Sequence, residues 1–87
     1  MTDNEKIARW AGLDNWLNYQ IKDQYAVLLL PILIKKDCTF KILGAPQNYY
    51  MEIAKGPGFC PMITVERQPT IAAAITAAIL QLIADKP

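Results

Sequence analysis

Residues 38–66 read CTFKILGAPQNYYMEIAKGPGFCPMITVE and decide the fold, because apolar and polar side chains alternate along most of this segment. Such alternation is typical of β-strands with one buried face. The runs that show it are residues 38–43, 49–53 and 59–66. Residues 44–48 and 55–58 separate these runs and contain the Gly and Pro residues that are typical of turns. Because short connections join antiparallel neighbours, the segment predicts a three-stranded antiparallel meander.

The alternation divides the strand side chains between two faces of the predicted sheet. One face would be wholly apolar, with Phe40, Ile42, Met51, Ile53, Ile63 and Val65. The other, called the mixed face below, would carry Thr39, Lys41, Tyr50, Glu52, Met62, Thr64 and Glu66. We expect the apolar face to pack under the long helices. Three roles are open for the mixed face: cover by a short N-terminal helix, pairing with a second copy, or binding of a ligand.

Two helices are predicted near the ends of the chain. Residues 5–11 predict a short amphipathic helix, and Trp10 is expected to anchor it in the core, as Trp16 does for the connector that follows. Residues 71–85 are rich in strong helix formers, with isoleucine and alanine at helical spacing. Thr70 is the expected N-cap of this last helix.

A further helix is predicted over residues 23–36, with Asp23 as its cap. The apolar run inside it is compatible with a buried helix or a buried strand, but its length and its terminal Lys35 and Lys36 favour a helix. Pro31 is unfavourable inside a continuous helix. A kink at this proline, or two abutting helical pieces, would reconcile these observations.

The expected fold is therefore a single α+β domain over residues 1–87. Its element order is α-α-β-β-β-α, a three-stranded antiparallel sheet with helices packed against it in an arrangement like an α/β/α sandwich. A length of 87 residues suits one domain. Apolar residues make up 53% of the chain, which is enough for a core and leaves apolar surface for a partner.

The charges are balanced, since nine Lys and Arg against eight Asp and Glu give a net charge of +1. This balance gives little attraction to phosphate backbones, so nucleic-acid binding is not expected. It also favours self-association, so we expect a homo-oligomer. The element order after residue 23 is that of a double-stranded-RNA-binding domain, but only Arg67 stands where that family carries its basic cluster.

No part of the sequence predicts contact with a membrane. The longest apolar run, residues 25–34, is shorter than the roughly 20 residues that a bilayer requires. The N-terminus is polar and acidic, unlike a signal peptide. We therefore expect a cytoplasmic protein.

Catalytic and metal sites are not expected either. Histidine is absent, which removes the catalytic triads and metal sites that depend on it. Cys38 and Cys60 match no metal or redox spacing and are expected to be free thiols, with a disulfide as the alternative. Glu52 and Glu66 on strand positions are more typical of solvated side chains than of an acid–base pair. The sequence thus predicts no enzyme activity, no metal and no cofactor.

The pair Tyr49-Tyr50 indicates binding instead. Neighbouring strand residues face opposite ways, so one ring should enter the core and the other should stay available. Exposed tyrosine is enriched in binding surfaces because it offers a large area with few rotatable bonds. Packing across the strands beside a turn is the alternative interpretation. The predicted binding residues are Lys41, Tyr49, Tyr50 and Glu52.

Three stretches give the chain a resemblance to the phage ABA sandwich domain family, a group of small phage and prophage proteins. They are KIARWAG at residues 6–12, LLLPILIKK at residues 28–36 and PTIAAAI at residues 69–75. The resemblance implies a sheet sandwiched by helices and a phage or prophage origin. Family members often carry a proline within the second helix, as this chain does at Pro31. The resemblance carries over no catalytic residue.

The leading hypothesis is a non-enzymatic phage or prophage accessory protein that acts by binding, as an inhibitor of a host defence protein. One alternative is an oligomeric sponge that sequesters a nucleotide-like signalling molecule. Its phosphates would meet Lys41, Lys55 or Arg67, and its base would stack on Tyr49 or Tyr50. Another alternative is a structural or assembly protein of the virion.

Overall fold

A computed structural model of the chain describes residues 2–13, 18–55 and 61–84, with the side chains of all of these except Pro61 and Met62. The elements are α1 (Asp3–Ala11), α2 (Asp23–Ala26), α3 (Leu29–Lys35), β1 (Cys38–Leu43), β2 (Tyr49–Lys55), β3 (Pro61–Gln68) and α4 (Ile71–Ala84). The predicted order of helices and strands is confirmed, with the second helix divided into α2 and α3. Trp16, Cys60 and most of the predicted turn at residues 55–58 lie outside the described residues.

The strands form one antiparallel sheet in the order β1-β2-β3, so the predicted meander is confirmed. β1 and β2 pair without interruption along the whole of β1. The turn between them is closed by two hydrogen bonds, from Ala45 N–H to the Asn48 carbonyl (3.3 Å) and from Asn48 N–H to the Ala45 carbonyl (2.9 Å). Inside this turn Gln47 has a φ of 58°, and left-handed backbone of this kind is typical of tight hairpin turns.

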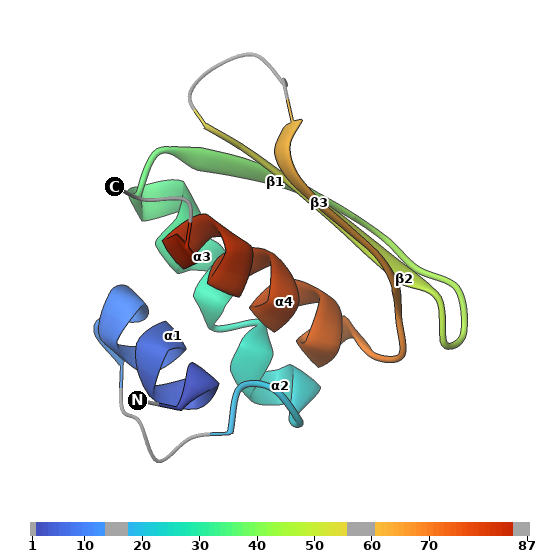
Figure 1. Cartoon of the computed structure of the whole chain (residues 1–87), viewed down its shortest axis with the longest axis horizontal. Helices are drawn as coiled ribbons and strands as arrows, with labels where there is room; N and C mark the ends of the chain where they lie inside the picture. The colour runs from blue at the N-terminus through green and yellow to red at the C-terminus, as the bar shows by residue number, and fades with distance from the viewer. Residues whose placement is uncertain (1, 14–17, 56–60, 85–87) are drawn as a thin grey trace.

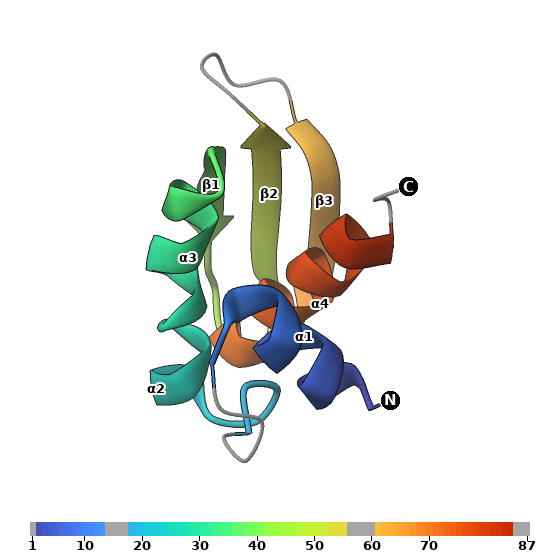
Figure 2. The same cartoon turned by 90° about the vertical axis from the view of Figure 1, so that its left-hand side faces the viewer.

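The described helices all lie on one side of the sheet (Figure 1). α4 packs on β2 and β3, and α3 packs on β1. α1 packs on α4 and forms a further layer on the side of α4 that faces away from the sheet (Figure 2). Of the three roles left open for the mixed face, cover by the short N-terminal helix is therefore excluded, and within the described residues no helix lies on that face. The layer order is sheet, then α3 and α4, then α1, which differs from the sandwich that the resemblance implies.

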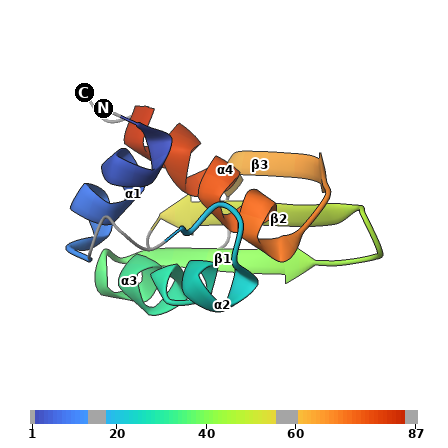
Figure 3. The ribbon, with the colours of Figure 1, turned by 90° about the horizontal axis from the view of Figure 1, so that it is seen from below.

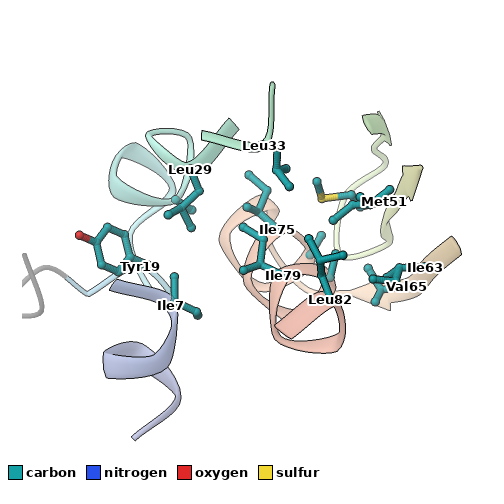
Figure 4. Packing of buried hydrophobic residues seen from close by; sticks show 14 of the residues in the cluster. Ile7, Tyr19, Leu29, Leu33, Met51, Ile63, Val65, Ile75, Ile79 and Leu82 are labelled. Carbon is teal, nitrogen blue, oxygen red and sulfur yellow. The ribbon is translucent and has the colours of Figure 1, made fainter. Parts of the chain in front are cut away.

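The core lies between the apolar face of the sheet and α4 (Figure 4). Met51 and Ile53 from β2 belong to the same core cluster as Ile75 and Ile79 from α4, and all four side chains are fully buried. Burying a side chain of this size stabilises the fold by about 1.5–3 kcal/mol. Small alanines on the same side of α4 let the helix approach the sheet closely. None of the helices in the described ranges is long and apolar enough to cross a membrane.

Pro31 explains the break between α2 and α3. Proline has no N–H, so in a continuous helix it would leave the carbonyl of Val27 without its partner. That carbonyl instead accepts a hydrogen bond from Leu30 N–H at 3.2 Å. Pro31 itself lies in the first turn of α3, where helix N–H groups have no acceptor within the helix. Of the two arrangements left open by the sequence, the structure therefore has two abutting helical pieces.

Asp23 caps a different helix from the one predicted. The N-cap of α2 is Lys22, whose side chain makes no capping hydrogen bond. Asp23 Oδ1 instead accepts from Ala72 N–H, at 2.9 Å, at the start of α4. Thr70 Oγ1 accepts from Ala73 N–H at 3.0 Å, as an N-cap should. α4 is thus capped twice, once by a carboxylate from a distant segment whose charge suits the helix dipole.

We expect Asp23→Ala to lower the free energy of unfolding by about 1 kcal/mol, because it leaves the N–H of Ala72 without its acceptor. Asp23→Asn keeps an oxygen at this place and should lose less stability. Urea denaturation of both variants measures the difference. Wild-type stability in the Ala variant would show that the link to α4 contributes nothing.

The N-terminal segment docks through the predicted Trp10, which packs against the core, and through side chains that were not predicted. Ile7 and Ala8 of α1 are buried, and Tyr19 in the connector is fully buried. Trp10 is only partly buried, with Lys36 Nζ 5.1 Å from its ring centroid, a distance typical of a cation–π contact. Trp10 Nε1 is buried and finds no hydrogen-bond partner in the described part of the chain. The indole therefore stabilises the docked N-terminal segment through contacts of its ring and not through a hydrogen bond.

Cys38 stands at the start of β1, where it behaves as a small apolar residue. Its side chain is 5% exposed and belongs to the core. The thiol is free, as predicted, and donates to the Lys36 carbonyl at 3.6 Å. A buried thiol of this kind is typical of a structural cysteine.

Candidate binding site on the mixed face

Three of the four predicted binding residues lie together on the mixed face. Lys41 of β1 is directly opposite Glu52 of β2, and Leu43 is opposite Tyr50. Because strand side chains alternate, these four point away from the helices. Lys41 is exposed, whereas Tyr50 and Glu52 are partly buried by their neighbours. Within the described residues no helix covers this face. Two of the three roles predicted for it therefore stay open: pairing with a second copy and binding of a ligand.

Tyr49 lies on the opposite, helix-covered face and packs against the core. Its ring covers Gly44 closely, because a Cβ at Gly44 would lie 2.7 Å from Tyr49 Cε1. The absence of a side chain at Gly44 makes room for the ring. The two tyrosines are thus divided between the faces of the sheet, and the position of Tyr49 separates it from the other predicted binding residues.

A pocket of about 390 Å³ opens beside Tyr50, where the turn between β1 and β2 meets the end of β3. Its lining residues are Leu43, Gly44, Ala45, Asn48, Tyr50, Glu66 and Arg67. This volume lies in the range of about 300–1,000 Å³ that is usual for small-molecule sites. A smaller pocket of about 220 Å³, beside α4, has no charged side chain in its lining. The pocket beside Tyr50, called the Tyr50 pocket below, is therefore the candidate site.

A β-bulge in β3 shapes the wall of the Tyr50 pocket. The register between β2 and β3 shifts there, so that Glu66 and Arg67 both stand opposite Tyr50. Regular alternation after Val65 would turn Arg67 toward the helices. The extra residue instead places Glu66 and Arg67 in the lining of the same pocket. Alternation predicted Glu66 on the mixed face, but the predicted strand ended there, and Arg67 was proposed only as a phosphate contact of the nucleotide alternative.

Arg67 adopts the left-handed conformation, with a φ of 56°. This conformation is unfavourable by roughly 1–2 kcal/mol for a residue that has a Cβ. Bulges and strained residues are concentrated at functional sites, where they re-aim a side chain. A glycine at position 67 would have signalled such a bulge, and the sequence has none there. The alternation of apolar residues alone therefore could not reveal it.

The side chains of the Tyr50 pocket suit binding rather than bond breaking. The Arg67 guanidinium presents donors to a carboxylate or phosphate, and the Asn48 amide can donate and accept. Tyr50 and Leu43 offer apolar surface beside these groups, and Glu66 adds a negative charge. Among the residues that the structure describes, no group of three His, Cys, Asp or Glu side chains could hold a metal ion. The arrangement fits a ligand with an anionic group next to a flat apolar one.

Arg67→Gly tests whether the backbone of Arg67 is strained in the bulge. Glycine adopts the left-handed conformation without strain, so the variant should be equally stable or more stable, by up to about 1 kcal/mol. Thr64→Gly, in the regular part of the same strand, should instead lower stability by roughly 0.5–1 kcal/mol. Thermal melts of both variants provide the comparison. If Arg67→Gly is as destabilising as Thr64→Gly, the strain assigned to Arg67 is absent.

Comparison of the chain with models of protein families, with curated proteins and with solved structures finds no match in any of the three. The resemblance to phage ABA sandwich proteins therefore stays a prediction from the three sequence stretches.

Proposed function

We propose that the chain is a non-enzymatic binding protein that holds its partner on the mixed face, with Tyr50 and Arg67 as the main contacts. The observation that supports this most is the bare sheet face with its pocket: within the described residues all helices lie on the other side. The bulge places the strained Arg67 opposite Tyr50, and this arrangement does not contribute to packing of the core. Tyrosine and arginine are also the residue types that most often dominate binding energies.

The charge pattern of the mixed face favours a protein as the partner. Lys41 and Arg67 alternate there with Glu52 and Glu66, so the face has no strong field of one sign. Interspersed charges with an aromatic side chain among them suit the polar rim and aromatic centre of a protein interface. A polyanion would require a basic cluster. On the resemblance, the partner would be a host protein that a phage or prophage accessory protein inhibits in the cytoplasm of the host cell.

Site-specific photo-crosslinking tests this proposal. A benzoylphenylalanine at position 50 should join the chain to one host protein in cells, whereas the same group at Gln81, on the exposed side of α4, should not. The captured protein, purified, should then bind the wild-type chain with a Kd that Arg67→Ala raises by about tenfold or more. Equal crosslinking from positions 50 and 81, or an unchanged Kd, would rule out the mixed face as the binding surface.

A nucleotide-like ligand is the second candidate, because Tyr50 and Arg67 line the same pocket. Tyrosine can stack on a base while arginine contacts a phosphate. Glu66 in the same lining opposes an anion, which makes this candidate the weaker one. Calorimetry with a panel of mononucleotides and cyclic dinucleotides distinguishes the two. Heat of binding that disappears in Tyr50→Ala supports the ligand, and no heat across the panel excludes it.

A further inference from the structure

Of the two edges of the sheet, the edge at β1 is the regular one. β1 has β2 on one side, and no described strand follows on its other side (Figure 3). All six residues of β1 pair with β2 without a bulge. The edge at β3 differs, because β3 begins at Pro61, which has no N–H, and contains the bulge at Arg67. Prolines and bulges keep an edge strand from pairing further, and β1 has neither.

The turn between β1 and β2 determines which backbone groups of β1 point outward from the sheet. Ala45 and Asn48 exchange two hydrogen bonds, and in an antiparallel ladder such pairs recur at every second residue. The next pairs of this kind along the register are Leu43 with Tyr50, Lys41 with Glu52 and Thr39 with Ala54. The Thr39 hydroxyl donates to the Ala54 carbonyl at 3.5 Å, which agrees with a carbonyl that faces β1.

Phe40 and Ile42, which lie between these pairs, therefore direct their backbone N–H and C=O groups away from β2. None of the backbone hydrogen bonds that the described residues form outside the helices and the sheet involves a residue of β1. α3 packs on the helix-covered side of β1 but supplies no backbone partner to it. Two donors and two acceptors in regular spacing form the kind of edge to which an extended peptide adds as a further strand.

The side chains of β1 on the mixed face indicate which strand fits this edge. Thr39, Lys41 and Leu43 point to that face, and all three are exposed. Lys41 is at the centre of the three, and Leu43 is 54% exposed although it is apolar. In an added strand, the residues opposite Lys41 and Leu43 would be two positions apart and on the same face. A carboxylate suits the first of these positions, and an apolar side chain suits the second.

We propose that an extended acidic segment of a protein partner adds to β1 as a further antiparallel strand, with a carboxylate opposite Lys41 and an apolar side chain opposite Leu43. The antiparallel direction is the more stable one per residue. Glu52 lies opposite Lys41 in β2, so the added carboxylate gives the ammonium group an acidic neighbour on its other side as well. Opposite charges that face each other across neighbouring strands stabilise the pairing.

Lys41 makes a second copy of the chain unfavourable as the added strand. If Phe40 paired with Ile42 of another copy across a two-fold axis, the two Lys41 side chains would lie directly opposite each other. A shift of the register by two residues would leave them diagonal on the same face, roughly 7–8 Å apart. Both arrangements bring two ammonium groups together, and a lysine on an edge strand is a known means of preventing such pairing.

This inference is independent of the site on the mixed face. It depends on the backbone of β1 and on Lys41, whereas that site depends on Tyr50 and Arg67. Crosslinking from position 50 and the Arg67→Ala variant do not test the edge, and the experiments below need neither. Each proposal can therefore fail while the other holds.

Hydrogen exchange of single amides, measured by NMR, tests the free edge. In the chain alone the amides of Phe40 and Ile42 should exchange much faster than those of Lys41 and Leu43, which donate to β2. Equal protection of all four amides, or the reverse pattern, would overturn the assignment of the outward groups. Protection of Phe40 and Ile42 that increases with the concentration of the chain alone would assign the edge to a second copy and also overturn the proposal.

An end-blocked peptide of the sequence Thr-Val-Thr-Glu-Thr is the probe for the added strand. At millimolar concentration it should slow exchange at Phe40 and Ile42 and leave exchange at Lys41 and Leu43 unchanged. The matched peptide with lysine in place of glutamate should bind with a Kd roughly three- to tenfold higher, because it places like charges opposite each other. Absence of binding by both peptides at millimolar concentration would overturn the proposal.

Lys41→Glu should reverse this preference, so that the lysine peptide binds more tightly than the glutamate peptide. Lys41→Gln removes the charge without placing a second carboxylate opposite Glu52, and it should bind both peptides alike. Lys6→Glu makes the same change on the exposed side of α1 and should keep the wild-type preference. The NMR spectrum of each variant shows whether the fold is retained. A folded Lys41→Glu or Lys41→Gln chain that still prefers the glutamate peptide would overturn the proposal.

Discussion

Ile53→Ala should lower the free energy of unfolding by about 2–5 kcal/mol, which for a domain of this size lowers the melting temperature by ten degrees or more. Ile53 is fully buried between the sheet and α4. Removing most of its side chain loses apolar burial and leaves a cavity that the surrounding strands and helix cannot close. A domain of 87 residues has little stability to spare, so the variant is expected to be partly unfolded at 37 °C.

Leu43→Ala is the control for this experiment. Leu43 is in the adjacent strand on the mixed face and is 54% exposed. It has the same number of carbon atoms as isoleucine, but truncating it should change the free energy of unfolding by about 0.5 kcal/mol or less. Urea denaturation of both variants measures the contrast. Similar losses in the two variants would mean that the sheet is covered on both faces, and the proposed binding surface would not exist.

Tyr50→Ala should weaken partner binding by at least about tenfold, or roughly 1.4 kcal/mol, while the melting temperature stays within a few degrees of wild type. Tyr50 lies on the mixed face and lines the Tyr50 pocket. It does not belong to the core cluster of the described residues. Truncation therefore removes contact area from the site but leaves the packing against α4 intact. The binding is measured with the host protein or ligand that crosslinking or calorimetry identifies.

Tyr49→Ala should have the opposite effects. Tyr49 packs against the core from the other face, with its ring over Gly44, so its loss should lower stability by roughly 1–3 kcal/mol. Binding per folded molecule should change little. The two neighbouring residues thus form a matched pair for the two faces. Collapse of the fold in Tyr50→Ala would place Tyr50 in the core and remove it from the binding site.

Local side-chain patterns were sufficient to predict most of the fold. The alternation in β1 and β2 predicted which residues face the helices, and Pro31 predicted the break between α2 and α3. The partner of Asp23 could not be predicted in this way. Asp23 precedes a helix in the sequence, as a cap does. Its carboxylate nevertheless accepts a hydrogen bond from Ala72, which is close to it only in the folded chain. Side-chain patterning describes a residue's neighbours along the sequence, whereas this hydrogen bond depends on tertiary packing.

The candidate site was predictable only in part, for a similar reason. Lys41, Tyr50 and Glu52 were assigned to one face by period-two alternation, and the structure places them there. Arg67 was not, because the predicted strand ended at residue 66 and the alternation of side chains does not reveal the bulge that places Arg67 opposite Tyr50. The arrangement of the helix layers also could not be predicted from the side-chain pattern. The apolar side of α1 could have packed on either the sheet or α4.

The contact between α1 and α4 affects how the chain is made in the cell. These helices lie side by side although they stand at opposite ends of the described sequence. The ribosome releases α1 before α4, so Ile7 emerges before α4, on which α1 packs, has been synthesised. The domain should consequently fold only after α4 has left the ribosome. Nascent chains stalled before residue 71 should be digested by a protease as fast as an unfolded peptide, while the released protein should resist.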